Sequence, residues 1–389
     1  MPSSSSSAAA ATDTTAPPRR RRSASAAIII ADRLRVLDER LSRPVFFLGL
    51  PKWIELVFSL PANLFGTTFS LVVGPLWIAL AALRTTGADA CYTATGSGNH
   101  LRILLLKVLA LAGTAVYAVA WAYGYQIRRR VGLGRKLFWK KTLYVYAYPW
   151  SVGVLRVTVG NLEPPPTTPG NLPGCENYDG VGRWAPGAIL SVALYPLVLW
   201  PFVAYLMNLL KDATGRHRPA RKDRDRGNSA ATSRKSFPLM TELLAEHDGD
   251  RSFPSGDVMM ATLLAIPLWT GLGLRGIPAA IVLSSALGRM YVLAHHLSDV
   301  TAGFGLVVAV HGLCGFAAVR FFGFPPEGGM IRGTAWWHPL LSIGLFVWAK
   351  KQRREAAVAV RNPRNRRTGV GKRSTIGTGR SPIYSSKDD

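Results

Sequence analysis

Cysteine is scarce in this chain: Cys91, Cys175 and Cys314 are the only three among 389 residues. No two of them have the close spacing of a zinc-binding pair, which excludes a cysteine-based zinc module. Cys314 lies in an apolar run and is expected to be a small core residue. Cys91 and Cys175 lie in polar segments, so they can form one disulfide if those segments share an oxidising side.

Acidic residues are also few, with 22 Asp and Glu against 47 Lys and Arg, and the net charge is +25. Charged residues make up 18% of the chain and hydrophobic residues 48%, with a mean hydropathy of +0.16. These values are too apolar for an ordinary soluble domain and too polar for a bare bundle of membrane spans. In such a chain, excess positive charge is more typical of cytoplasmic loops and anionic lipid surfaces than of nucleic-acid binding, so we expect no nucleic-acid partner.

Neither a cleavable signal peptide nor an internal repeat is evident. The basic cluster at residues 19–22 is followed by a short apolar run and then by charges, not by a cleavage site. Residues 1–27 are rich in Ser, Ala, Thr and Arg and are predicted to be a disordered tail, as is the basic tail 350–389.

Residues 28–52 are predicted to form an interfacial amphipathic segment. Ile30, Leu34, Leu37 and Leu41 recur at helical spacing among arginines, which suits a helix lying on the membrane surface. A short helix packed on a helical bundle explains the same pattern equally well.

Long apolar runs follow, and each is compared with the roughly 20 residues that a spanning helix needs. Residues 142–160 are borderline, and residues 335–349 are short enough to lie flat at the interface. The sequence therefore predicts an all-α, polytopic membrane helical bundle over residues 53–349. The expected spans are 54–83, 103–125, 185–210, 256–274, 277–294 and 300–321.

The charge of the loops predicts the orientation. Segment 126–141 has seven Lys or Arg and no acid, so we expect it on the cytoplasmic side, together with both termini. If residues 142–160 cross the membrane, the acidic loop 161–184 is exoplasmic and the loop 211–254 is cytoplasmic. If residues 142–160 only dip into the membrane, the loop 211–254 faces the lumen.

Three short segments place rare polar residues at the ends of these spans, where ionisable groups are costly and usually functional. They are residues 211–219, 254–257 and 289–299. If the span borders are right, an even number of crossings brings all three segments to one membrane face.

These segments contain the parts of an anion site. Lys211, Arg218 and Arg289 supply positive charge, and guanidinium groups suit phosphate oxygens. The Ser255-Gly256 turn at a helix start offers backbone N–H groups and the positive end of the helix dipole.

The third segment also contains a candidate nucleophile. His295 and Asp299 are four residues apart, which on a helix places them on one face. There the carboxylate can hold one ring nitrogen and leave the other free to attack. A histidine nucleophile beside a cationic phosphate site predicts phosphoryl transfer through a phosphohistidine.

Each segment alone also has a simpler interpretation. A basic cluster after a span can be a stop-transfer signal, and a Pro-Ser-Gly-Asp turn can be a helix cap. Arg289, His295 and His296 can be satisfied polar residues of a bundle. A metal site from His217, His295, His296 and Asp299 is disfavoured because nearby cationic side chains repel a cation. We therefore expect no metal and no cofactor.

Together the segments resemble the signature of the type 2 phosphatidic acid phosphatase and vanadium haloperoxidase superfamily. Its pattern is Lys-x6-Arg-Pro, Pro-Ser-Gly-His and Ser-Arg-x5-His-x3-Asp, and the resemblance covers residues 185–321. It implies a six-helix membrane core that dephosphorylates lipid phosphates or diphosphates without metal. It also implies phosphate binding by Lys211, Arg218, Ser255, Gly256 and Arg289, with His295 as nucleophile oriented by Asp299.

Two positions depart from that pattern. Gly288 replaces the usual serine, and Asp257 replaces the histidine that protonates the leaving group. We consider three explanations of Asp257. It is protonated in the complex and acts as the acid, or the substrate is a diphosphate that needs less help, or His217 supplies the proton.

The expected protein is thus a multi-pass membrane lipid phosphatase whose partners are the bilayer and a lipid phosphate or diphosphate. If the chain is eukaryotic, the endoplasmic reticulum or another endomembrane is its expected location. The alternatives are a lipid head-group phosphotransferase and a pseudophosphatase that binds lipid phosphates. The sequence carries no signal for the oligomeric state.

Overall fold

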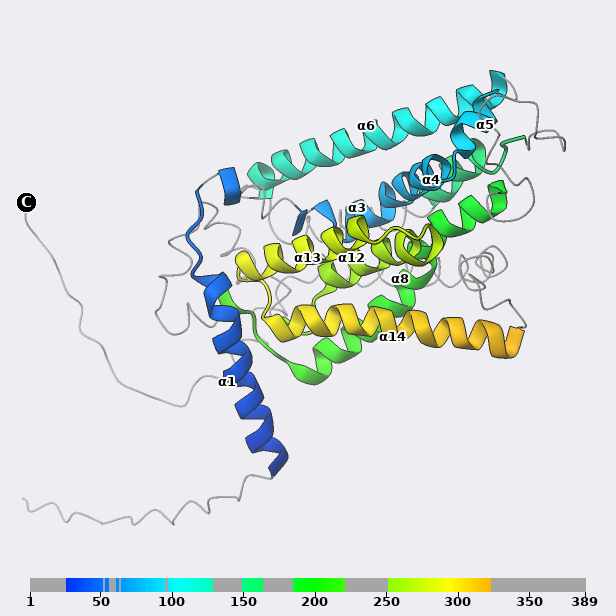
Figure 1. The fold of residues 1–389 in the computed structure, drawn as a ribbon. Coiled ribbons are helices and arrows are strands. Elements are labelled where there is room, and N and C mark those ends of the chain that lie inside the picture. The colour runs from blue at the N-terminus through cyan, green and yellow to red at the C-terminus, as the bar shows by residue number, and fades with distance from the viewer. Residues whose placement is uncertain are drawn as a thin grey trace, which may run out of the picture.

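The computed structural model describes residues 26–51, 53–55, 61–62, 64–94, 97–128, 149–163, 185–220 and 251–322. Helices dominate these residues, and no strand occurs among them, so the all-α prediction is confirmed. Both predicted tails lie outside the described residues, except for residues 26–27, and so does segment 335–349. The helices in Figure 1 are α1 (Ala26–Phe46), α3 (Thr67–Val72), α4 (Gly74–Thr85), α5 (Ala88–Ala94), α6 (Ser97–Arg128), α8 (Pro186–Thr214), α12 (Gly256–Ile266), α13 (Gly276–Tyr291) and α14 (Leu297–Phe322).

Three of the described helices are long and apolar enough to cross a membrane. These spans are Gly98–Val119 in α6, Pro186–Lys211 in α8 and Leu297–Phe321 in α14, and they coincide with three predicted spans. Helix α12 continues through a π-helical turn, Pro267–Gly271, as a shorter apolar element. The six-helix core stays a prediction.

The predicted span at 54–83 is wrong as one continuous helix. Helix α3 ends at Val72, and α4 begins at Gly74 with Pro75 in its first turn. Proline has no N–H to continue the hydrogen-bond ladder of a preceding helix, but its fixed φ suits the first turn of a new one. Over residues 67–83, which the structure describes, the apolar run is therefore divided between two helices.

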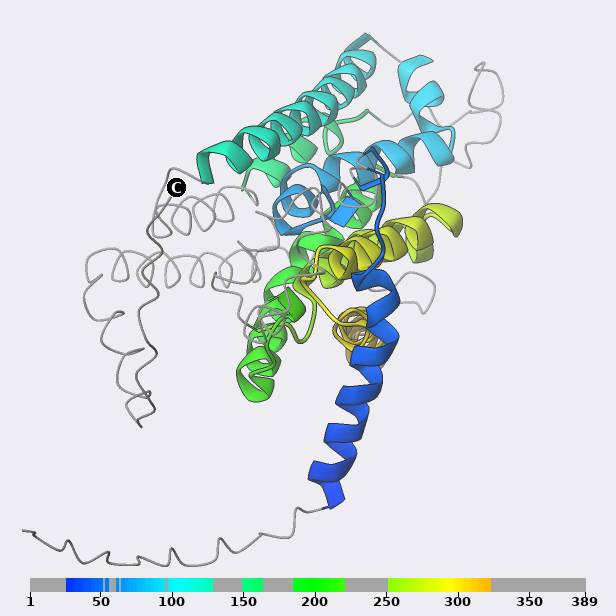
Figure 2. The same ribbon diagram turned by 90° about the vertical axis from the view of Figure 1, so that its left-hand side faces the viewer.

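Helix α12 lies at the centre of the bundle, between α8, α13 and α14 (Figures 1 and 2). Every residue from Val258 to Ile266 is buried, as expected of a helix that is apolar on all sides. By contrast, α6 and α14 bury only small parts of their spans and expose large apolar side chains such as Leu111 and Phe316. These outward faces have the character of lipid-facing surface.

Helix α1 packs on the bundle with its C-terminal half, while its N-terminal half projects away from the other helices (Figures 1 and 2). Asp38, Ser42 and Phe46 are buried, whereas Leu34, Leu37 and Leu41 of the predicted apolar stripe are exposed. The helix thus contacts the bundle through a partly polar face and leaves its leucines uncovered.

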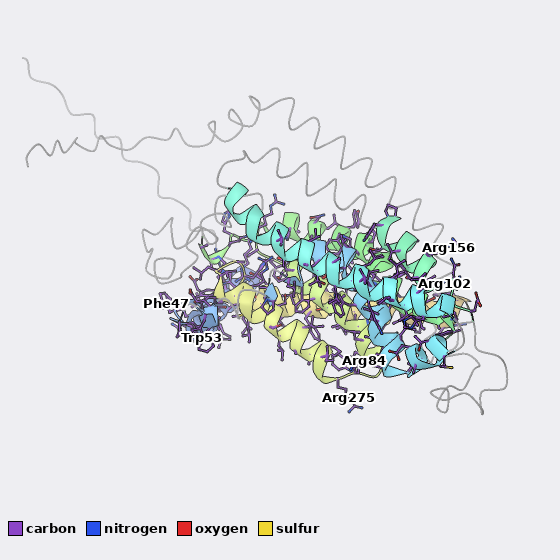
Figure 3. The ribbon with its side chains drawn as sticks, turned by 90° about the horizontal axis from the view of Figure 1, so that it is seen from above. Phe47, Trp53, Arg84, Arg102, Arg156 and Arg275 are labelled. Carbon is purple, nitrogen blue, oxygen red and sulfur yellow. The ribbon has the colours of Figure 1, made fainter. Side chains whose placement is uncertain are left out.

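The helices have two distinct ends. Residues 161–163 lie beside the start of α6, where the Asn99 side chain and the backbone of Glu163 exchange two hydrogen bonds of 3.0 Å. Arg102 and Arg156 lie at this end, and Phe47 and Trp53 lie at the other (Figure 3). Helices α6 and α8 both run from the first end to the second, where α13 gives way to α14 (Figure 1).

The two cysteines among the described residues differ in chemistry. Cys91, in α5 just before the start of α6, is disulfide-bonded, and Cys314 is a free thiol. The prediction that Cys91 forms a disulfide is thus supported. Its predicted partner, Cys175, lies outside the described residues.

Candidate active site

Backbone hydrogen bonds join the three segments that the sequence singled out. The Ser252 N–H, two residues before the second segment, donates to the carbonyl of Arg216 in the first segment at 2.7 Å. The Ala220 N–H donates to the carbonyl of Leu293 at 3.2 Å, and the Ser255 N–H donates to that of Asp299 at 2.9 Å. The three segments therefore form one cluster, at the end of the bundle where α8 ends and α14 begins.

Two left-handed residues make this cluster possible. Gly215 ends α8 with φ of 54° and donates its N–H to the carbonyl of Lys211, so the helix ends about one turn after the lysine. Leu293 has φ of 59° in the turn between α13 and α14, a conformation that is costly for a non-glycine residue. Such strain is concentrated at functional sites, and this turn directly precedes His295.

Two glycines allow close contact at the start of α12. A Cβ on Gly303 of α14 would lie 2.8 Å from the carbonyl oxygen of Ser255, and one on Gly256 would lie 2.7 Å from the sulfur of Met207 in α8. A larger residue at position 303 would have to displace the backbone of Ser255, whereas one at position 256 would require the flexible Met207 side chain to move. Gly256 therefore has a packing role in addition to its predicted place in a phosphate site.

His295, in the third segment, is fully buried against the residues that precede the second segment. Its Nδ1 lies 2.7 Å from the carbonyl oxygen of Ser252 and 3.8 Å from Oδ2 of Asp299. A carbonyl oxygen can only accept a hydrogen bond, so Nδ1 carries the proton and Nε2 has a free lone pair. Burial lowers the pKa of His295 to about 4, with smaller contributions from Arg218 and Lys211, so the ring is neutral at neutral pH.

The expected arrangement of His295 and Asp299 on one helix is not what the structure has. His295 precedes α14, and Asp299 lies in its first turn. The nearest partner of the imidazole is therefore the backbone of Ser252, which sequence reasoning missed because a carbonyl gives no residue-type signal. Asp299 Oδ2 instead accepts a 2.8 Å hydrogen bond from the N–H of His296.

The predicted cationic residues interact electrostatically with this cluster. Arg218 interacts with Arg289, Asp257 and Asp299, and Lys211 interacts with His295. Burial and the neighbouring Arg289 lower the pKa of Arg218 to about 10, which still leaves the guanidinium charged at neutral pH.

The hydroxyl oxygen of Ser255 and Nε of Arg289 are among the buried polar atoms that have no hydrogen-bond partner in the described part of the chain, as is Nε of Arg216. Leaving such groups unpaired is costly, so they are candidates to bind a ligand. Beside a helix start and cationic side chains, they suit the oxygens of a phosphate.

Asp257 forms an ion pair with Arg289, and both side chains are largely buried. The residue at the position of the leaving-group acid thus contacts one of the three predicted phosphate-binding cations. Gly288, the other departure from the family pattern, is buried in α13 next to Arg289.

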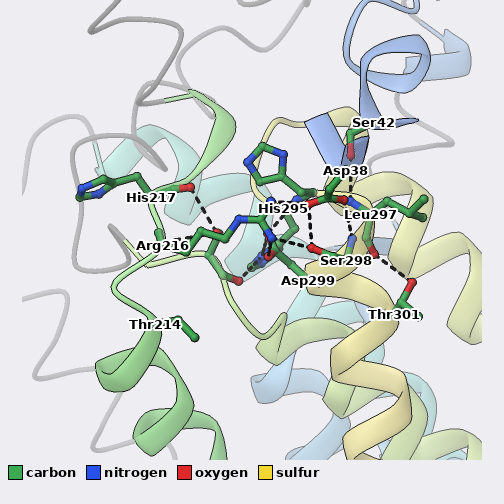
Figure 4. A network of polar contacts seen from close by, with 12 residues as sticks. Asp38, Ser42, Thr214, Arg216, His217, His295, Leu297, Ser298, Asp299 and Thr301 are labelled. Atoms are coloured by element: carbon green, nitrogen blue, oxygen red, sulfur yellow. Dashed lines mark hydrogen bonds and ion pairs between the residues drawn. The ribbon is translucent and has the colours of Figure 1, made fainter. Parts of the chain in front are cut away.

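The two remaining histidines differ in placement. His217 is exposed, and its ring points away from that of His295 in Figure 4. His296 is buried, with its ring edge-on to that of Phe46 in α1 at a centroid distance of 5.6 Å.

Sequence reasoning also missed a set of polar partners around Asp299. Arg216 donates to Asp299 Oδ1 at 3.0 Å and to the hydroxyl of Ser298 at 2.5 Å (Figure 4). Arg216 also pairs with Asp38 of α1. An arginine between two family positions was visible in the sequence, but nothing local connected it with an acid 178 residues away.

Within the described residues, no group of three or more His, Cys, Asp or Glu side chains could hold a metal ion. The side chains that interact electrostatically with His295 instead include the cationic Lys211 and Arg218.

Comparison with known protein families agrees with this arrangement. The family model described as the PAP2 superfamily matches residues 189–320, which contain all three segments. Comparisons with curated proteins and with solved structures find no match. The match over residues 189–320 is consistent with a member of the type 2 phosphatidic acid phosphatase superfamily.

Proposed function

We propose that the protein is an integral, multi-pass membrane phosphatase that hydrolyses a lipid phosphate or diphosphate through a phosphohistidine on His295. Members of the PAP2 superfamily are generally phosphatases, and the apolar spans fit a membrane enzyme. The observation that carries the proposal is the buried, neutral imidazole of His295, with its proton on Nδ1 and electrostatic contact with Lys211 and Arg218.

In the first step, Nε2 of His295 attacks phosphorus, forming a P–N bond as the bond between phosphorus and the leaving oxygen breaks. Lys211, Arg218, Arg289 and the Ser255-Gly256 turn bind the phosphoryl oxygens and stabilise the charge that spreads over them. The imidazole becomes positive in this step, and the nearby carboxylate of Asp299 stabilises that charge. Water then cleaves the P–N bond, which releases phosphate and restores His295.

The leaving group limits the choice of substrate. A carboxylate in an ion pair has no proton to donate, and Asp257 is paired with Arg289. When the terminal phosphoryl group of a lipid diphosphate is transferred, the leaving group is the lipid monophosphate, which is a weaker base than an alkoxide and needs less protonation. The ion pair therefore supports a lipid diphosphate over a monoester. The exposed, outward-pointing ring of His217 gives little support to this residue as the acid.

A pseudophosphatase is the second candidate, because the Asp257–Arg289 pair occupies a cation that substrate would need. A head-group phosphotransferase would use the same phosphohistidine with an alcohol as acceptor. Phosphate release by purified wild-type protein and by His295→Ala separates enzyme from binding protein. Product analysis with and without an acceptor lipid separates hydrolysis from transfer.

We further propose that the site opens to the cytoplasmic side. Helix α6 ends at Arg128, within the basic segment 126–141, at the same end of the bundle as the site. The contacts of Glu163 with Asn99 support a crossing by residues 142–160, because they bring the chain back to the opposite end. That opposite end carries the disulfide of Cys91, and disulfides form and persist in oxidising compartments, which the cytoplasm is not. The exposed leucines of α1 would then lie at the cytoplasmic membrane interface.

A further inference from the structure

We propose that Asp38 and Arg216 position the nucleophile, so that helix α1, far outside the PAP2 region, is part of the active site. The inference rests on the proposed phosphohistidine chemistry and assigns a role to two residues that the family signature does not contain. Neither residue is proposed to touch substrate; both act through Asp299.

Arg216 joins two acids from distant parts of the chain. One guanidinium nitrogen, Nη1, donates to Asp299 Oδ1 at 3.0 Å, and the other, Nη2, pairs with Oδ2 of Asp38. The Asp299 side chain is fully buried, and those of Asp38 and Arg216 are 9% and 16% exposed. Removing one partner from such a buried set leaves an uncompensated charge, so the geometry of Asp299 depends on Asp38.

Helix α1 also caps α14. Asp38 accepts hydrogen bonds from the backbone N–H of Ser298 at 2.8 Å and from its hydroxyl at 2.7 Å. Ser42, one turn further along α1, accepts from the N–H of Leu297 at 2.9 Å. The first N–H groups of a helix have no partner within the helix, and here side chains from α1 satisfy two of them (Figure 4).

These contacts converge on the turn that carries His295. Asp299 divides its oxygens: Oδ1 binds Arg216, while Oδ2 accepts the His296 N–H at 2.8 Å and lies 3.8 Å from the His295 ring. A carboxylate released by Arg216 can rotate, which changes both the backbone next to the nucleophile and the charge that faces its imidazole. A displacement of about 1 Å at a reacting group can reduce a rate about a hundredfold.

The test compares full-length wild-type protein in detergent micelles with Asp38→Asn, Arg216→Gln, the double variant and Asp38→Glu. Glu39→Gln, on the same helix, and Arg275→Gln, at the opposite end of the bundle, are matched controls. The measurements are kcat and KM for phosphate release from a prenyl diphosphate, together with the rate of phosphoenzyme formation. The melting temperature and elution profile of each variant establish that it is folded, and Ser42→Ala replaces Asp38→Asn if that variant does not fold.

We expect Asp38→Asn and Arg216→Gln each to reduce kcat and phosphoenzyme formation about ten- to a hundredfold with KM within about twofold. The kcat of the double variant should be no lower than that of the slower single variant, because the effects of residues that act as a unit are not additive. Asp38→Glu should recover part of the rate, and the two controls should match the wild type.

A folded Asp38→Asn or Ser42→Ala protein with wild-type kcat would overturn the inference, as would losses that multiply in the double variant. The same assay on His295→Ala separates this failure from that of the proposed function. If His295→Ala is inactive while the Asp38 and Arg216 variants are normal, only the positioning role is wrong. If His295→Ala keeps its activity, the proposed function itself fails.

Discussion

Asp257 and Arg289 form an ion pair at the start of α12, so the residue at the family's general-acid position contacts one of its phosphate-binding cations. In the proposed reaction, phosphate and the Asp257 carboxylate would compete for the same guanidinium. This relationship bears directly on which leaving groups the site can expel.

Replacing Asp257 tests that relationship. Asp257→His restores the family pattern and should raise kcat/KM for phosphatidic acid about a hundredfold, the lower end of the range for general acid catalysis. Asp257→Asn removes the competing charge and should lower KM for a prenyl diphosphate without reducing kcat. Both are checked by phosphate release from the two lipids. A tenfold loss of kcat in Asp257→Asn on the diphosphate would instead identify Asp257 as the acid.

Arg218 is expected to bind the phosphoryl oxygens throughout the reaction. Arg218→Ala should lower kcat/KM about 10²- to 10³-fold, the usual cost of removing a donor that stabilises transition-state charge. Arg218→Lys keeps the charge but not the two-pronged geometry and should recover only part of this loss. Steady-state kinetics with Arg275→Ala as the control measure the effect, and equal rates for Arg218→Ala and the control would exclude the role.

The low pKa of His295 predicts the pH dependence of activity. The ring is charged only as the pH approaches about 4, whereas an ordinary histidine titrates at 6.5. The acid limb of kcat/KM should therefore lie well below pH 6. An acid limb centred on pH 6.5 would show that the nucleophile is not buried as described.

The same pKa also predicts a change in stability. Between pH 6.5 and about 4 the unfolded chain binds a proton at His295 that the folded protein does not, so the free energy of unfolding falls as the pH falls through this window. Thermal unfolding of wild type and His295→Gln over this range should show a smaller loss in the variant. Parallel curves would contradict the buried neutral imidazole.

Sidedness can be tested with single cysteines at exposed positions on the two ends. Arg35→Cys lies on α1 at the site end, and Arg275→Cys lies at the opposite end (Figure 3). In sealed microsomes, whose cytoplasmic face is outward, a membrane-impermeant maleimide should label Arg35→Cys directly and Arg275→Cys only after permeabilisation. Wild-type protein measures the background from Cys314. The reverse pattern would place the site in the lumen.

That the three segments lie together could be predicted from sequence, because side-chain type and spacing carry the family pattern, and the roles of their residues stay predictions. Lys211, Arg218 and Arg289 are cations at the ends of apolar runs, where little other than function favours a charge. Three separated segments with the family spacings also indicated a resemblance over residues 185–321, and the PAP2 family model matches residues 189–320.

The contacts between those residues were not predictable in the same way. The partner of His295 is the carbonyl of Ser252, and every residue type offers the same carbonyl. The ion pairs of Arg216 with Asp38 and Asp299 join positions far apart in sequence. A single acid on an amphipathic helix gives no sequence signal for such a contact. Hydropathy alone also failed at Pro75, because it records apolar length and not the continuity of a hydrogen-bond ladder.

The most direct test of the account is trapping of the covalent intermediate. Wild-type protein and His295→Ala are mixed with a lipid diphosphate labelled at its terminal phosphate, quenched, and analysed for protein-bound label. The account predicts an acid-labile, alkali-stable phosphoenzyme in the wild type and none in His295→Ala. Turnover by that variant should be lower by at least about 10³-fold. Equal phosphate release by both proteins, or label bound to a residue other than His295, would contradict it.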